Sequence, residues 1–357
     1  MSRRGLVRVT DLSGYECAPD QPIRLAMTRL NASDHLFQLV VDSNRRLLGT
    51  VTDGDVRRAL LRGVSLDDPV RDCMHTAYVA GRSGDDSRNR ELAGGMKFLP
   101  ILDDGGRVCE VLAPGSRLGG IGTAVVMAGG FGTRLGERTR NTPKPLLPVA
   151  GKPILEHVIA SLEAAAVPRA YLTLHYLADQ VRAFGEARRG SIALHYVIED
   201  QPLGTAGALT LIPDLGAGPV LVVNGDVITD ADFAALHDFH VRHQHDATIG
   251  VSRYEHRLPF GVVRHDEHGL FRRIDEKPLI SEYISAGLYY LEPAVLALIP
   301  RGRPVDMPEV LNAAQEVGLR IGLFPIHEYW TDVGRPHDLA AADSSLAGPR
   351  NAGAADG

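Results

Sequence analysis

The sequence has few cysteines, no excess of basic residues and no long apolar run. Its three cysteines (Cys17, Cys73 and Cys109) are scattered over 357 residues without CxxC spacing, which argues against a disulfide framework or a zinc site. There are 38 basic and 44 acidic side chains, so nothing in the net charge of −6 favours a nucleic-acid partner. No run is long enough for a signal peptide or a membrane span. We therefore expect a cytoplasmic protein with no membrane or nucleic-acid partner.

The length of the chain and one break in its composition predict two domains. A chain of 357 residues is too long for one small core. Residues 114–121 are rich in proline and glycine, as linkers often are. We accordingly expect a first domain over residues 1–116, a second over 121–345, and a flexible tail of small polar residues over 346–357.

The first domain contains a strand–turn–strand pattern twice. Residues 36–41 and 47–52 form the first copy, which a helix from Asp55 follows. Residues 98–102 and 108–112 form a weaker copy, after which Pro114 and Gly115 stop any helix. Two copies in about a hundred residues indicate a tandem repeat of a small α+β unit.

The second domain alternates between strand and helix patterns. This alternation predicts an α/β fold with a Rossmann-like, mostly parallel sheet and helices on both faces. Ligands of such sheets bind beyond the carboxyl ends of the strands. The predicted strands are 123–127, 170–174, 192–197, 220–223, 247–251 and 284–290, and the clearest helices are 154–165 and 231–243.

A glycine-rich loop directly follows the first strand of the second domain. Its glycines let backbone N–H groups approach an anion closely. The spacing GxxxxGK[ST] of a P-loop is absent, and a dinucleotide-binding fingerprint would need glycine or alanine where Leu135 stands. Further along, prolines can hold Lys144 in a fixed direction, and the fork of Arg134 can bind two phosphate oxygens. The loop is therefore interpreted as a binding site for a nucleoside triphosphate.

The whole segment 129–153, GGFGTRLGERTRNTPKPLLPVAGKP, resembles the signature of the sugar nucleotidyltransferase family, which runs G-G-x-G-T-R-L, P-K-P and G-K-P. Later motifs extend the resemblance to about residue 345. It implies transfer of a nucleoside monophosphate from a nucleoside triphosphate to a sugar-1-phosphate, with release of pyrophosphate. It assigns catalytic roles to Arg134, Lys144 and Lys277, and nucleotide binding to Ala128, Gly129, Gly130, Gly132 and Thr133.

Two aspartates are the candidate metal ligands. Asp226 ends the apolar strand that leads into Asn224-Gly225, and Asp332 lies in Trp330–Gly334, which matches the family's W-x-D-x-G. A lone aspartate at a strand end is more often a cap, but the resemblance makes these two the holders of a catalytic Mg²⁺. Because Mg²⁺ keeps water and substrate phosphates in its shell, two carboxylates suffice.

Other motifs resemble the family's sugar and base loops. Glu276-Lys277-Pro278 matches its E-K-P motif, which implies that Lys277 holds the sugar phosphate and Glu276 accepts hydrogen bonds from sugar hydroxyls. Gly261 and Gly287 lie in segments that match sugar-lining loops, although they can equally be ordinary strand or bulge glycines.

Residues 199–207 resemble the loop that reads the base, and the candidate contacts are Glu199, Pro202 and Gly204. A carboxylate only accepts hydrogen bonds and guanine offers adjacent N–H donors, which favours GTP. Relatives that use other nucleotides also carry glutamate here, so UTP, CTP and dTTP stay open.

The histidines of residues 237–245 do not form a zinc site in this interpretation. His237, His240 and His243 drift around one broad helix face, and no cysteine or acid completes a tetrahedral set with them and His245. We expect a solvated helix face.

The segment 47–57 resembles the G-x-(V/I)-T-x-x-D stretch of CBS domains, which pair into modules that often bind adenine nucleotides. The resemblance implies that Thr52 contacts phosphate and Asp55 the ribose, although Asp55 can equally be a helix N-cap. The second repeat lacks T-x-x-D, so at most one site is expected, and a module that only dimerises or braces the enzyme is the alternative. We expect a homo-oligomer.

The order of the two domains resembles bacterial guanylyltransferases that act on glucosamine-1-phosphate or mannose-1-phosphate. A regulatory homologue that binds nucleotide sugars without turnover is the non-enzyme alternative. Intact Arg134, Lys144, Asp226, Lys277 and Asp332 disfavour it.

Overall fold

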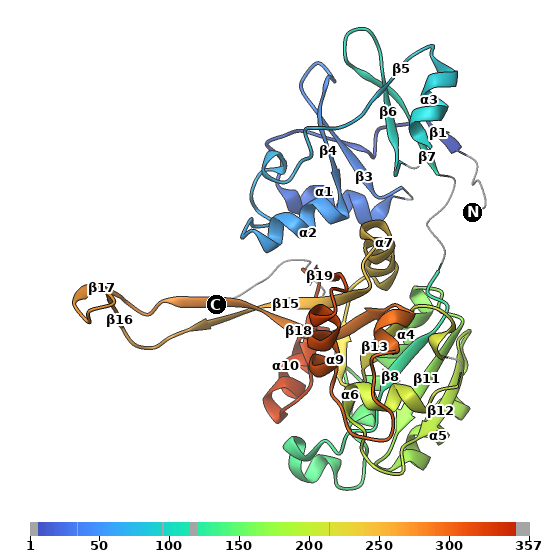
Figure 1. The fold of residues 1–357 in the computed structure, drawn as a ribbon, viewed down its shortest axis with the longest axis vertical. Coiled ribbons are helices and arrows are strands. Elements are labelled where there is room, and N and C mark those ends of the chain that lie inside the picture. Colours follow the sequence, from blue (N-terminus) through green and yellow to red (C-terminus); the bar gives the residue numbers. More distant parts are fainter. Residues whose placement is uncertain (1–5, 34, 95, 115–119, 214, 348–357) are drawn as a thin grey trace. The chain divides into compact units, whose positions relative to one another are not determined.

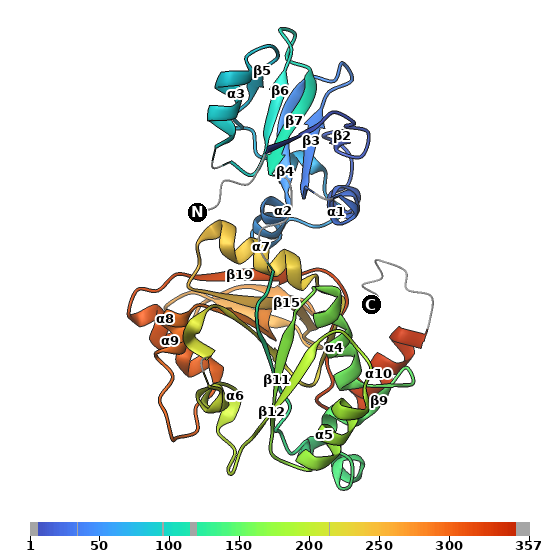
Figure 2. The same ribbon diagram turned by 90° about the vertical axis from the view of Figure 1, so that its right-hand side faces the viewer.

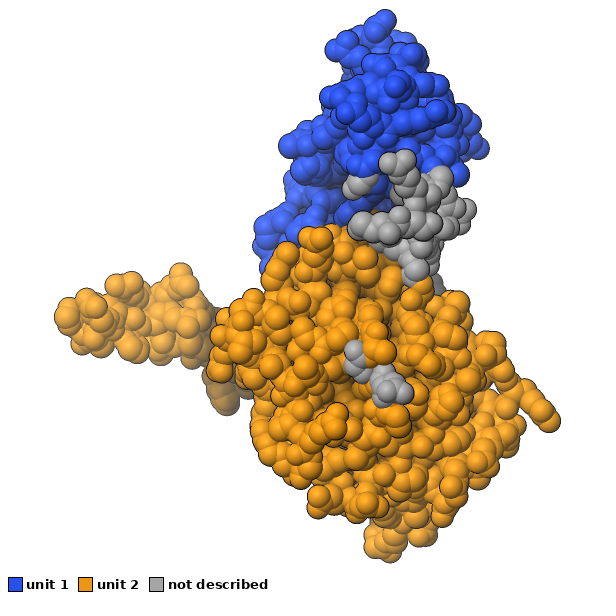
Figure 3. Space-filling model, turned by 45° about the vertical axis from the view of Figure 1, so that its right-hand side comes forward, with its two compact units in different colours: residues 1–119 blue, residues 120–357 orange. Residues whose placement is uncertain are grey.

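The computed structural model describes residues 6–33, 35–94, 96–114, 120–213 and 215–347. The chain divides into two compact units, residues 1–119 and 120–357 (Figure 3). None of the helices in the described ranges combines the length and the apolar character that crossing a membrane requires.

The first half of unit 1 is a three-stranded sheet packed against two helices. β2 is parallel to β3, and β3 forms an antiparallel hairpin with β4. Ile23, Leu30, Val51 and Val56 are fully buried between the sheet and the helices. The elements are β2 (Glu16–Cys17), α1 (Ile23–Ala32), β3 (Phe37–Val41), β4 (Leu47–Thr52) and α2 (Asp53–Leu61), followed by a 3₁₀ turn at Val70–Asp72.

The second half of unit 1 repeats this order, and its hairpin agrees with the predicted second strand–turn–strand copy. A short strand, a helix and a hairpin again follow one another, and the short strand is again parallel to the first strand of the hairpin. The elements are β5 (Gly81–Arg82), α3 (Asp86–Ala93), β6 (Leu99–Leu102) and β7 (Val108–Pro114), and β1 (Leu6–Val9) adds an edge strand beside β7. Gly115, where we expected any helix to stop, lies outside the described residues.

Unit 2 is built on a seven-stranded sheet of order β12-β11-β8-β13-β18-β15-β19. Only β18 is antiparallel to its neighbours, so the prediction of a mostly parallel sheet is confirmed. The strands are β8 (Ala124–Met127), β11 (Arg169–Leu174), β12 (Ala193–Ile198), β13 (Val220–Asn224), β15 (Ala247–Arg257), β18 (Leu279–Leu291) and β19 (Ile321–Ile326). Our predicted list lacks β19, because Gly322 and Pro325 interrupt its strand pattern; both are tolerated at a sheet edge.

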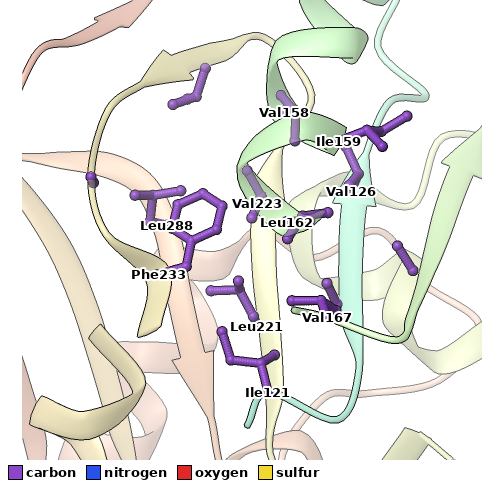
Figure 4. Close-up of a cluster of buried hydrophobic side chains, with 14 of the residues drawn as sticks. Ile121, Val126, Val158, Ile159, Leu162, Val167, Leu221, Val223, Phe233 and Leu288 are labelled. Atoms are coloured by element: carbon purple, nitrogen blue, oxygen red, sulfur yellow. The ribbon is translucent and has the colours of Figure 1, made fainter. Parts of the chain in front are cut away.

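Helices cover both faces of this sheet (Figure 2). Successive residues of one strand point to opposite faces, so Val126 joins one core and Val125 the other. Val126, Leu162 and Phe233 pack together on the first face (Figure 4). The helices on that face are α4 (Ile154–Ala164), α5 (Ala178–Ala187) and α7 (Phe233–His243), and those on the other are α6 (Gly204–Gly207), α8 (Pro293–Leu296) and α9 (Met307–Glu316).

Short elements connect the strands and helices of unit 2. β14 is antiparallel to β20, and β9 to β10. The elements are the 3₁₀ helices at Thr133–Thr139, Lys144–Leu146, Ala208–Leu211 and Leu215–Ala217, with β9 (Pro148–Val149), β10 (Lys152–Pro153), β14 (Val227–Thr229), β20 (Trp330–Asp332) and α10 (Pro336–Ala347). α10 includes residues 346 and 347, which we expected in the tail; residues 348–357 lie outside the described part.

The strands β15 and β18 continue beyond the sheet as a two-stranded arm, which we define as residues 253–283 (Figure 1). Every residue from Arg253 to Arg257 pairs with one from Tyr283 to Leu279. The arm ends in a second hairpin formed by β16 (Val262–His265) and β17 (Phe271–Asp275).

The expectation that the histidines of α7 form a solvated face is wrong. His237 and His240 are 8% and 1% exposed. The imidazole of His240 forms hydrogen bonds with Thr248 Oγ1 at 2.9 Å and Glu292 Oε1 at 3.2 Å, so its polar atoms are satisfied inside the protein. Burial lowers the pKa of His240, in opposition to Glu292.

Candidate active site

The glycine loop begins where β8 ends, at the carboxyl edge of the sheet. Gly132 adopts a left-handed conformation (φ +65°), and an added Cβ would lie 3.0 Å from Lys144 Cβ, so only glycine fits without strain. The hydroxyl of Thr139 donates to the carbonyl of Gly132 at 3.0 Å and closes the loop.

The predicted anion-binding groups lie on the open side of this loop. Ala128 is buried and its N–H donates to the carbonyl of Thr173, while Gly130, Thr133 and Arg134 are exposed. The loop is thus anchored at its base and leaves its backbone and the Arg134 guanidinium available to a ligand.

A lysine and two aspartates meet beside the loop. Lys144 Nζ lies 2.5 Å from Asp226 Oδ2 and 3.9 Å from Asp332 Oδ1. The pairing of β14 with β20 places Val227 opposite Asp332, which brings the two carboxylates together although 106 positions separate them. In addition, the N–H of Val333 donates to the carbonyl of Asp226 at 3.0 Å. The structure therefore unites three of the residues that the sequence assigns to catalysis and metal binding.

The electrostatics of this cluster suit a divalent cation. Half of the Asp332 side chain is exposed, yet burial by the surrounding protein and repulsion from Asp226 raise the pKa of Asp332 to about 6. A bound cation would favour the ionised form of both aspartates. No group of three or more histidine, cysteine, aspartate or glutamate side chains in the described ranges could enclose a metal. Two oxygen donors on an open edge fit Mg²⁺, which takes its other ligands from water and phosphate.

Glu199 lies beneath the glycine loop, at the carboxyl end of β12. Its Oε1 is 2.6 Å from the position that a Cβ on Gly129 would occupy, and its Oε2 accepts the N–H of Leu203 at 3.0 Å. The residue is only 6% exposed, and burial raises its pKa, while the bond from Leu203 opposes this rise. Glu199 therefore braces the loop 199–204 against the glycine loop.

His175 is a contact that sequence reasoning missed. Its Nδ1 lies 2.8 Å from the carbonyl oxygen of Glu199, and its ring meets Phe131 edge-on. The available signal was its position directly after the strand β11, at the carboxyl edge of a mostly parallel sheet.

Gly204 and Pro202 lie in the same region. Gly204 has φ +76°, and a Cβ there would lie 2.6 Å from the carbonyl oxygen of Val305. The glycine is therefore required by packing against its own chain, a reason that the sequence does not reveal. Pro202 is exposed beside it.

Strands β13, β18 and β20 also line the site. Gly287, with φ +70°, lies against Asn224, whose Nδ2 is 2.7 Å from the position of a Cβ on that glycine. The indole of Trp330 donates to the carbonyl of Ala286 at 2.9 Å. Asn224 is another residue that our assignments missed: its Oδ1 is buried without a hydrogen-bond partner in the structure.

Three of the predicted sugar-site residues lie elsewhere. Gly261, Glu276 and Lys277 are on the arm, and Figures 1 and 3 show the arm projecting away from the body of unit 2. A Cβ on Gly261 would lie 2.9 Å from Glu276 Oε2, so the two segments of the arm contact one another. The structure thus gathers the loop, the metal pair and Gly287, but it does not bring Gly261, Glu276 and Lys277 to them.

In unit 1, Thr52 and Asp55 form a capping box at the start of α2. Thr52 is the N-cap and Asp55 the third helical residue, so the alternative that Asp55 is the N-cap is wrong. The N–H and the hydroxyl of Thr52 donate to Asp55 Oδ2 at 2.9 and 2.6 Å, and Arg58 donates to Asp55 Oδ1 at 2.6 Å. With these bonds, the side chains of Thr52 and Asp55 stabilise the start of α2.

Comparison with known proteins identifies the class. The family model described as nucleotidyl transferase matches residues 123–348, most of the chain, and the CBS domain model matches residues 15–62. The chain therefore belongs to the nucleotidyl transferase family and carries a CBS domain in the first half of unit 1.

Named relatives agree with this assignment. A region of the chain is 35% identical to the mannose-1-phosphate guanylyltransferase catalytic subunit beta of Drosophila melanogaster, over 60% of this chain and 60% of the relative. It is 35% identical to the mannose-1-phosphate guanylyltransferase of Mycobacterium tuberculosis, over 62% and 64%. The chain thus spans less than two thirds of these relatives. A crystal structure from Bacillus anthracis, provisionally described as a glucose-1-phosphate thymidylyltransferase, matches with a TM-score of 0.53 and 25% identity, over 64% of this chain and 96% of that one.

Proposed function

We propose that the protein transfers a nucleoside monophosphate from a nucleoside triphosphate to a hexose-1-phosphate and releases pyrophosphate. The observation that carries this proposal is the cluster of Lys144, Asp226 and Asp332 beside the glycine loop. Membership in the nucleotidyl transferase family supports it.

The reaction needs no protein nucleophile, because a phosphate oxygen of the sugar-1-phosphate attacks the α-phosphorus and pyrophosphate leaves. Asp226 and Asp332 would hold Mg²⁺, which when bound offsets phosphate charge and orients the phosphates. Lys144 reduces the repulsion between the two anionic reactants. Exposed Arg134 stabilises the charge that develops on pyrophosphate, and the loop N–H groups orient the triphosphate. Catalysis then comes from positioning and electrostatics.

We propose GTP as the nucleotide, and glucosamine-1-phosphate or mannose-1-phosphate as the acceptor. The support for GTP is the guanylyltransferase names of the relatives, because Glu199 is buried beneath the glycine loop and its Oε2 already accepts the N–H of Leu203. Support for the sugar comes from the same names. The CBS domain is proposed to bind an adenine nucleotide or to dimerise the chain, and a cytoplasmic location remains a prediction from the sequence.

The direct test is pyrophosphate release with Mg²⁺ across four nucleoside triphosphates and a panel of hexose-1-phosphates. We expect release with GTP and one of the two proposed sugars, and loss of it in the variant Asp226→Ala. The matched control Asp179→Ala removes an exposed aspartate from α5 and should keep full turnover. If no triphosphate releases pyrophosphate with any sugar phosphate, the chain is a binding homologue and the proposal fails.

A further inference from the structure

The arm exposes an unusual concentration of apolar side chains. It contains eight of the 19 large hydrophobic residues that are exposed in the described part of the chain, within only 27 positions. They are Tyr254, Phe260, Val263, Leu270, Phe271, Ile274, Leu279 and Ile280. Val263 pairs directly with Ile274, so these two side chains share one face of the end hairpin. A two-stranded hairpin is marginal in water when nothing covers it, and clustered apolar groups of this kind mark contact surfaces.

The arm also carries residues that its own active site lacks. Glu276 and Lys277 are exposed, and among the described residues Lys277 makes no hydrogen bond or ion pair. Trp330, on the strand that carries Asp332, donates to Ala286, and Leu279 lies seven positions before Ala286 on β18. Seven residues of extended strand span roughly 23 Å, several times the length of a lysine side chain. Lys277 therefore does not reach the Asp226–Asp332 pair of its own chain.

The root of the arm is fixed by the sheet. β15 pairs with β19 as far as Ser252, and β18 pairs with β13 as far as Leu288 and accepts a hydrogen bond from Trp330 at Ala286. Beyond that point the ladder is uninterrupted from Ser252 to Arg257. Swinging the arm over its own site would break these pairings, so the arm points outward from the same edge that holds the site.

We propose that the arm of one copy lies across the active-site edge of a second copy of this chain, and that its Lys277 holds the sugar phosphate there. This inference rests on the proposed function. Because the arm leaves from the edge that holds the site, two copies related by a two-fold axis exchange arms reciprocally. Each complete site then combines the loop and metal pair of one copy with Glu276 and Lys277 of the other, and the apolar side chains of both arms become covered.

The test is complementation between two inactive variants co-expressed with different tags. Asp226→Ala has a defective metal site but an intact arm, and Lys277→Ala has the reverse. Each alone should release pyrophosphate at least about 100-fold more slowly than the wild type. In a random mixture half of the dimers are mixed and each contains one intact site, so about one quarter of wild-type activity should return. If the arm serves its own chain, no mixture regains activity and the inference is overturned.

A second pair of variants shows which chain donates the arm. Val263→Ser with Ile274→Ser replaces exposed side chains, so folding should be unaffected. Placed in the Asp226→Ala chain, these changes should abolish the recovered activity; placed in the Lys277→Ala chain, they should leave most of it. Equal effects of the two serine changes in the Asp226→Ala chain and in the Lys277→Ala chain contradict the proposal. Arg272→Ala, which removes another exposed cation from the arm, is the control and should release pyrophosphate at the wild-type rate on its own.

The outcomes separate this inference from the proposed function. A wild-type chain without pyrophosphate release refutes the function. An active wild type whose Lys277→Ala variant is fully active, or which sediments as a monomer at every concentration, refutes the arm exchange and leaves the function intact.

Discussion

The strands β15 and β18 make two different structures out of one hairpin. Their inner halves lie in the middle of the sheet, where β13 and β19 flank them and helices cover both faces. Their outer halves form the arm and keep only each other as partners. Tyr290 on the inner half is 1% exposed, whereas Tyr254 on the outer half is 54% exposed. Residues of the same two strands therefore form part of the core or an exposed contact surface, depending on which neighbours the tertiary structure supplies.

The largest effect should come from the cluster of Lys144, Asp226 and Asp332. Lys144→Met leaves Asp226 and Asp332 without their cation and removes the charge that offsets phosphate repulsion. We expect kcat to fall by about 10²–10³-fold. Steady-state pyrophosphate release measures this, and Arg189→Met, which removes an exposed cation from the same unit, should behave as wild type. A variant Lys144→Met with normal kcat would remove Lys144 from the mechanism.

The two tyrosines give a matched stability test of the hairpin. Tyr290→Ala opens a cavity beside the rings of His237 and His240 and should lower the free energy of unfolding by about 3–5 kcal/mol. Tyr254→Ala changes an exposed side chain and should change it by less than about 0.5 kcal/mol in dilute protein. Urea unfolding measures both. Similar losses would mean that the arm is part of the folding core rather than an appendage.

The smallest effect concerns pH. Burial lowers the pKa of His245 from 6.5 to about 4, so the unfolded chain takes up a proton in a range where the folded chain does not. The stabilisation is complete above pH 6.5 and is lost as the pH falls from 6.5 towards 4. Urea unfolding at pH 7 and pH 5 should show this loss, and His245→Gln should reduce it. His268→Gln, at the exposed end of the arm, should leave the pH dependence unchanged. An unchanged dependence in His245→Gln would refute the assignment.

Much of unit 2 could be predicted because its signals are local. Apolar runs of four to seven residues gave six of the seven strands. The glycine-rich pattern located the loop, whereas the metal role of Asp226 came from the resemblance to the family. The role of Asp332 needed the family motif, because its approach to Asp226 depends on β14 pairing with β20.

The failures share a physical cause. His240 was assigned to a solvated face because the histidines of this helix drift around one broad side of it, but Thr248 and Glu292 from other elements satisfy its imidazole inside the protein. Asn224 and His175 were missed because the residues beside them, Gly287 and Glu199, come from distant parts of the sequence. Such contacts between distant segments leave no period or spacing in the sequence.

The sequence by itself determined the alternation of strands and helices, the glycine loop and the identity of the charged groups, because backbone propensity and side-chain chemistry are local properties. Only the tertiary structure decided which of these groups meet. It placed Asp332 against Asp226 through one strand pairing, and it carried Lys277 outward on the arm. The physical reason is that a strand has the same local conformation inside a sheet and beyond it, so its neighbours alone decide whether its residues are buried, catalytic or free to contact a second chain.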